Sequence, residues 1–98
     1  MRSRYSAYAR GLISYIIETT HQSGPAWEEP RALWQKKLQL FSKQTEFLTL
    51  EIFESTVEED RGMVHFRAEI NQPEGRTTLE EKSTFWRVDS QWLYYGFE

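Results

Sequence analysis

Apolar side chains in the first twenty residues recur every three or four positions, as in a helix that buries one face. This spacing predicts one helix from about Ser3 to Thr20. Five residues share its predicted buried face: Tyr5, Tyr8, Ala9, Leu12 and Ile16. Gly24 and Pro25 follow and end the pattern, because both residues oppose helix continuation.

A second helix is predicted to begin at Pro30, since proline is favoured in the first turn of a helix. Its buried face is predicted from the same spacing: Leu33, Trp34, Lys37, Leu38 and Phe41. Lys37 fits this face because its stem covers apolar surface while its amine reaches water. The helical pattern fades between Ser42 and Thr45.

From residue 47 onward the period changes to two, which indicates strands. In the first strand one face carries Leu48, Leu50 and Ile52, and Phe47 is placed on the opposite face. In the second strand the apolar face is formed by four residues: Val64, Phe66, Ala68 and Ile70. Two further strands are predicted over TLEEKSTFWRV and WLYYGF, with the polar turns VEEDRG, NQPEGR and VDSQ between strands.

Two helices followed by four strands predict a single α+β domain over residues 1–98. The short turns suit an antiparallel meander, whose apolar face must be buried against the helices. A curved sheet that wraps a helix leaves a cleft between them. Such a cleft is a usual place for a small-molecule site.

Composition excludes several classes of function. The chain has no cysteine, so it offers no disulfide and no thiolate zinc site, which fits a cytoplasmic protein. No apolar run approaches the roughly 20 residues that span a bilayer, so no membrane association is expected. The basic residues of the first half do not cluster densely enough to predict nucleic-acid binding.

Charge is divided unevenly along the chain. Residues 1–45 carry a net charge of +4 and residues 46–98 a net charge of −7. Two interpretations are open: two differently solvated faces, or a dipolar molecule that associates with itself.

Several segments, in order, are similar to one known family: MRSRYSAY, Thr19 and His21, FLTLEI, VHFRA, and LEEKSTF followed by WLYY. They resemble the middle domain of the bacterial YchJ-like proteins. The resemblance covers nearly the whole chain, and MRSRYSAY is its most specific part. It implies a nuclear-transport-factor-2-like fold, in which a cone of curved sheet surrounds helices. It implies no particular reaction.

Three departures from the family pattern stand out. Family members often carry a cysteine-rich, metal-binding SEC-C segment before MRSRY. This sequence starts at MRSRY and has no cysteine, so the segment is expected either to be missing or to lie outside the given sequence. Where the family tends to have His and Arg in L-H-E-R-S, this chain has Glu80 and Lys82. The usual D-G end of the last strand is replaced by Gly96 and Phe97. A function that needs an imidazole or a planar guanidinium at residues 80–82 is therefore in doubt.

The arginines and tyrosines of MRSRYSAY are the first site candidates. Arg2 and Arg4 would bind a carboxylate or phosphate, and Tyr5 and Tyr8 would line the cleft. The structural alternative pairs Arg4 with a sheet carboxylate, either Glu69 or Glu81, while the tyrosines pack in the core.

Further candidates lie beyond the first helix. Glu81 shares parity with apolar neighbours and is expected to point inward, as a general base or as the partner of Arg4 or Arg10. His21 and Ser83 complete the candidate cleft. His65 is expected to be exposed beside Arg67, and no histidine spacing matches a metal site, so neither a metal nor a cofactor is predicted.

Two hypotheses of function follow. The first is a non-enzymatic binding or accessory domain that takes an unidentified small molecule. It would form a homodimer through the outer sheet face, with Phe53, Trp86 and Val88 buried between subunits. The second is a small isomerase, dehydratase or hydrolase that uses Glu81 or His21 as acid or base. Fold alone does not decide between them, and the discriminating feature is whether either residue points into a closed cavity beside the tyrosines.

Overall fold

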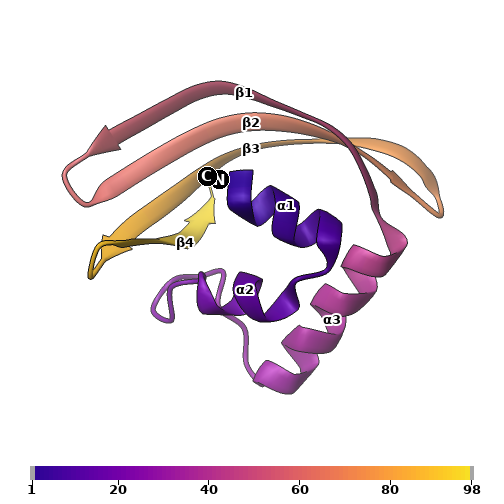
Figure 1. The fold of residues 1–98 in the computed structure, drawn as a ribbon, viewed down its shortest axis with the longest axis horizontal. Helices are drawn as coiled ribbons and strands as arrows, with labels where there is room; N and C mark the ends of the chain where they lie inside the picture. The colour runs from indigo at the N-terminus through magenta and orange to yellow at the C-terminus, as the bar shows by residue number, and fades with distance from the viewer. Residues whose placement is uncertain (1, 98) are drawn as a thin grey trace.

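A four-stranded antiparallel sheet arches over three helices in the computed structural model, which describes residues 2–97 (Figure 1). The helices come first in the chain: α1 (Arg2–Arg10), α2 (Ile13–Glu18) and α3 (Arg31–Gln44). The strands follow in the spatial order β1-β2-β3-β4: β1 (Glu46–Glu58), β2 (Arg61–Gln72), β3 (Gly75–Val88) and β4 (Gln91–Phe97). The predicted α+β class and the antiparallel meander are confirmed.

The predicted first helix is wrong in one respect, because it is two helices separated at Gly11. Gly11 has a φ of 70°, a left-handed conformation that favours glycine. The N–H of Leu12 donates to the carbonyl of Ala7 at 2.8 Å, and the N–H of Gly11 to that of Tyr8 at 3.4 Å. These bonds form the glycine end typical of helices. The chain then turns, so Ala9 and Leu12 are exposed instead of buried.

Replacement of Gly11 by alanine is expected to destabilise the fold. An L-residue in the left-handed region costs about 1 kcal/mol, and the free energy of unfolding should fall by about that amount. Urea denaturation measures it. Gly11→Asn is the matched control and should lose less, since asparagine tolerates this conformation. Equal stability of Gly11→Ala and the wild type would contradict the assigned turn.

The core has a helical part and a sheet part. The helical part joins α1, α2 and α3 through six buried residues: Ala7, Ile13, Ile16, Ile17, Trp34 and Leu38. The sheet contributes its inward face from β2 and β3: Phe66, Ala68, Ile70 and Phe85.

The predicted buried face of α3 was too wide. Leu33 is 56% exposed, and Lys37 lies at the surface, where it pairs with Glu28 at 2.6 Å.

The predicted alternation in β1 fails at its start. The pairing of β1 with β2 shifts register between Phe47 and Thr49, as at a β-bulge. The shift leaves Leu48 38% exposed and turns Phe47 toward the helices. The Phe47 ring lies edge-on to that of Tyr5, with centroids 5.3 Å apart, and to that of Phe41 at 6.1 Å. A single extra residue therefore supplies an aromatic side chain to the space beneath the sheet.

The segment after α2 covers the edge of β4. The N–H of Tyr94 donates to the carbonyl of Thr19 at 2.7 Å, and the N–H of His21 donates to the carbonyl of Tyr94 at 2.9 Å. Ala26 adds a third bond, to the carbonyl of Tyr95 at 3.3 Å. Three backbone groups of β4 on this edge are thus paired, which holds the end of α2 against the sheet.

Candidate functional site

A cavity of about 320 Å³ lies between α1, α3 and the concave face of the sheet. Its size is at the lower end of the roughly 300–1,000 Å³ of ligand pockets. Its wall is mainly apolar and is formed by eight residues: Tyr5, Leu38, Phe41, Phe47, Phe66, Ala68, Leu79 and Phe85. The other five lining residues form a cluster of charged and hydroxyl groups: Arg4, Tyr8, Glu81, Ser83 and Tyr94.

Five of the six predicted cleft residues line this one cavity: Arg4, Tyr5, Tyr8, Glu81 and Ser83. His21 does not. Its ring lies against Trp86 and Tyr95, with centroids 5.1 and 5.5 Å apart, because its backbone is bound along the β4 edge. The side chain of Arg2 lies outside the described part of the chain. The structure thus brings Glu81 beside the tyrosines and places His21 elsewhere.

The side chain of Arg4 is held by hydrogen bonds to the end of α2. Its Nη1 donates to the carbonyl of Ile16 at 3.1 Å and to Oγ1 of Thr19 at 2.7 Å, while only 8% of the residue is exposed. The expected pairing with Glu69 or Glu81 is wrong. Within residues 3–97, no carboxylate oxygen lies within 4.0 Å of its guanidinium. Burial lowers the pKa of Arg4, and this buried charge has no ionic partner in that range.

Glu81 comes from the inward side of β3 and accepts two hydrogen bonds on one oxygen. Ser83, which is 1% exposed, donates to Oε2, and the hydroxyl of Tyr94 donates to the same oxygen at 3.1 Å. Burial and the negative charge of Glu81 both raise the pKa of Tyr94. The Tyr94 phenol therefore stays protonated and acts as a donor to the Glu81 carboxylate.

The two tyrosines link the arginine to the glutamate. The Arg4 guanidinium lies 4.6 Å from the ring centroid of Tyr94 and 6.0 Å from that of Tyr8. Burial raises the pKa of Tyr8, with Arg4 acting to lower it and Glu81 acting to raise it. Both charges thus act on the same pair of phenols, and the polar groups of the cavity form one connected cluster.

Sequence reasoning missed Tyr94, Phe47, Leu79 and Phe85 as lining residues. Tyr94 could have been found from the alternation in WLYYGF once the pairing of β3 with β4 was known. Phe85 and Tyr94 are paired between these strands and therefore share a face of the sheet. Phe47 had no such signal, since the bulge in β1 reverses its side.

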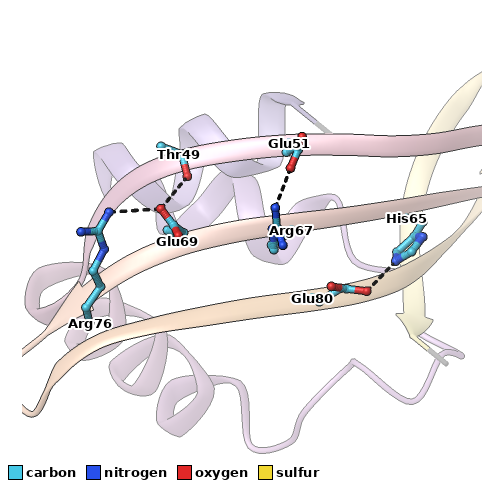
Figure 2. Close-up of polar contacts among 7 residues, drawn as sticks. All are labelled: Thr49, Glu51, His65, Arg67, Glu69, Arg76 and Glu80. Atoms are coloured by element: carbon cyan, nitrogen blue, oxygen red, sulfur yellow. Dashed lines mark hydrogen bonds and ion pairs between the residues drawn. The ribbon is translucent and has the colours of Figure 1, made fainter.

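The outer face of the sheet carries pairs of polar side chains across its centre (Figure 2). Glu51 pairs with Arg67 at 3.0 Å, and Glu80 pairs with His65 at the same distance. Glu69 pairs with Arg76 at 3.1 Å. His65 is therefore half-buried beside Glu80 and is not the exposed side chain that was expected.

The homodimer through this outer face stays a prediction. Of the three residues expected in the interface, Phe53 is 46% exposed and Val88 is 40% exposed. Trp86 is partly covered, because it stacks on Tyr95 at 3.9 Å and lies under the guanidinium of Arg61 at 3.7 Å.

None of the helices in residues 2–97 is both long and apolar enough to cross a bilayer. Over the same residues, no three His, Cys, Asp or Glu side chains gather as a metal-binding group.

Relatives named UPF0225 proteins match nearly all of this chain. A UPF0225 protein of Vibrio parahaemolyticus is 34% identical over 96 residues, which are 96% of this chain and 54% of that protein. A UPF0225 protein of Haemophilus influenzae is 33% identical over 95 residues, which are 96% of this chain and 56% of that protein. The chain thus spans about half the length of these relatives.

Two solved structures have the same architecture. The solution structure of a SEC-C motif containing protein from Rhodopseudomonas palustris matches with a TM-score of 0.82 and 31% identity, over all of this chain and 73% of the other. The crystal structure of a SEC-C motif containing protein from Psychrobacter arcticus matches with a TM-score of 0.72 and 27% identity, over all of this chain and 56% of the other. Residues 1–96 match the family model of the YchJ middle NTF2-like domain, and the chain therefore belongs to this YchJ-like family.

Proposed function

We propose that this domain binds a small molecule in the cavity between α1 and the sheet. The observation that carries the proposal is a cavity of about 320 Å³ with an apolar wall and a connected group of polar side chains. Protein sites for small molecules usually combine apolar walls with a few polar groups that set the orientation of the ligand. Buried polar groups are costly to assemble, and a ligand that uses them accounts for their presence here.

A metabolite screen by thermal shift tests the proposal. A compound that binds only the native state raises the melting temperature, and the stabilisation grows with the logarithm of the ratio of its concentration to its dissociation constant. Two variants locate the site. Leu79 lines the cavity and is 40% exposed, so Leu79→Trp should obstruct the cavity and abolish the shift. Thr78→Trp places the same ring at the neighbouring exposed position and should leave the shift intact.

Two results would contradict the proposal. One is a screen in which no compound raises the melting temperature. The other is a set of compounds whose effect survives in Leu79→Trp, because these compounds would bind outside the cavity.

A second candidate function, acid–base catalysis, is supported by one observation. The carboxylate of Glu81 faces the cavity and is held by Ser83 and Tyr94, as a positioned general base would be. In an isomerase, dehydratase or hydrolase it would take a proton from the bound molecule. The compounds found in the screen decide the matter when their NMR spectra are followed over time. Turnover of a compound that is abolished in Glu81→Gln would favour an enzyme. Spectra that do not change over time would favour a non-enzymatic binding domain.

A further inference from the structure

The charged residues that line the cavity are of opposite sign. Within the described part of the chain they are Arg4 and Glu81, and the remaining lining residues are uncharged. The ion pairs of residues 3–97 all lie on the outside, and neither Arg4 nor Glu81 belongs to one. The cavity is therefore lined by one cationic and one anionic side chain that do not form an ion pair with each other.

Each charge is anchored mainly on one side. The hydrogen bonds that Arg4 donates to the end of α2 all leave from Nη1, toward carbonyl and hydroxyl groups. Its guanidinium also interacts with Tyr8, another residue of the cavity lining. The recorded hydrogen bonds of Glu81 both end at Oε2. No side-chain nitrogen or oxygen within the described residues is both buried and without a partner, so the other guanidinium nitrogens and Oε1 of Glu81 retain access to solvent or to a ligand.

Electrostatics then restricts the ligand. A monoanion bound at Arg4 would leave Glu81 as an uncompensated negative charge in a mainly apolar space. A monocation bound at Glu81 would leave the buried Arg4 without an anion. A ligand that carries both a carboxylate and an ammonium group neutralises both residues, and the bonds formed are of the strong, charge-assisted kind.

The rest of the wall selects the body of the ligand. Four aromatic side chains from four different elements face the same space: Phe41, Phe47, Phe66 and Phe85. An aromatic or branched aliphatic group buries its surface there favourably.

We propose that the cavity binds a zwitterionic, hydrophobic α-amino acid, with its carboxylate at Arg4, its ammonium group at Glu81 and its side chain against the phenylalanines. This inference rests on the proposed binding function and names the class of ligand. The pKa of Tyr8, which both charges affect, is consistent with the two groups meeting at one end of the cavity.

Calorimetric titration of the chain with four matched compounds tests the inference. The compounds are L-phenylalanine, 3-phenylpropionate, phenethylamine and phenethyl alcohol, which share the phenyl body and differ in charge. L-phenylalanine should bind at least about tenfold more tightly than either singly charged compound, because each loses one charged hydrogen-bonding partner.

Variants assign the two charges. Glu81→Gln should reduce the preference for L-phenylalanine over 3-phenylpropionate by about tenfold. Its control is Glu80→Gln, which alters the neighbouring residue on the outer face and should leave the preference unchanged. Arg4→Lys keeps the charge near its position and should retain the preference for a carboxylate.

The outcomes separate this inference from the proposal on which it rests. Equal binding of the four compounds, or a preference that survives in Glu81→Gln, overturns the amino-acid assignment while the cavity remains a binding site. Absence of binding by all four compounds overturns the amino-acid assignment, and the thermal-shift screen then decides alone whether the cavity binds another class. Binding that persists in Leu79→Trp overturns both.

Discussion

Arg4→Ala is expected to lower the free energy of unfolding by more than about 1.5 kcal/mol. The substitution removes charge-assisted hydrogen bonds to Ile16 and Thr19, and the guanidinium no longer covers the ring of Tyr94. Relief of the cost of a buried charge offsets part of this loss. For a domain of this size the melting temperature should fall by about 6 °C or more.

Chemical denaturation of Arg4→Ala beside Arg10→Ala measures the effect. Arg10 is exposed at the end of α1, so its removal should change the stability by less than about 0.5 kcal/mol. If Arg4→Ala were as stable as the wild type, the anchoring of α1 to α2 through Arg4 would be refuted. Arg4 would then serve the cavity alone.

Gly24→Ala is expected to destabilise the protein by about 2 kcal/mol, within the range for overpacked sites. A Cβ atom at this position would lie 2.5 Å from the carbonyl oxygen of Tyr95 and 3.2 Å from its carbonyl carbon. These are backbone atoms of β4, so the clash cannot be relieved by a rotamer change. The segment of residues 19–26 must move away from the edge of β4, and hydrogen bonds such as that from the N–H of Ala26 to the carbonyl of Tyr95 must lengthen.

Gly62→Ala is the matched control, since its Cβ would meet its nearest neighbours at 3.5 Å, an ordinary contact. Hydrogen exchange gives a second measurement, because the amides of His21, Ala26 and Tyr94 should lose protection in Gly24→Ala. Unchanged protection and stability in Gly24→Ala would show that the segment does not lie on β4 as described.

Most of the fold could be predicted from the spacing of the apolar residues and from the residue types in the turns. Alternation placed Phe66, Ala68 and Ile70 on the buried face of the sheet, because register and facing are fixed together when one face is buried. Helical spacing found Trp34 and Leu38 in the same way. These positions depend on local pattern and hydrophobic burial alone.

The errors arose where one residue changes the direction of the chain. Gly11 divides the first helix, and the apolar spacing continues through it, so the pattern alone concealed the break. The bulge near Leu48 reverses the side of Phe47 without any change in composition. His21 was placed in the cleft because of its neighbours in sequence, whereas backbone pairing with Tyr94 directs it to the other side.

Within the site, parity identified Glu81 but not its partners. Tyr94 is 13 residues away on β4, and its bond to Glu81 depends on the pairing of β3 with β4. The partners of Arg4 were misjudged because opposite charge suggested a sheet carboxylate. The structure instead satisfies Arg4 with the carbonyl of Ile16 in α2 and the hydroxyl groups of Thr19 and Thr20 just after it, 12 to 16 residues away in the sequence.

The most direct test that the cavity binds a hydrophobic α-amino acid is a ¹H–¹⁵N NMR titration of the wild-type chain with L-phenylalanine. We expect the largest amide shifts on residues that line the cavity, such as Phe66, Ala68 and Glu81. Amides of outer-face residues such as Arg67 and Glu80 share the same strands and should shift less. Shifts centred on the outer face, or no shifts at high ligand concentration, would show that the cavity does not bind this amino acid.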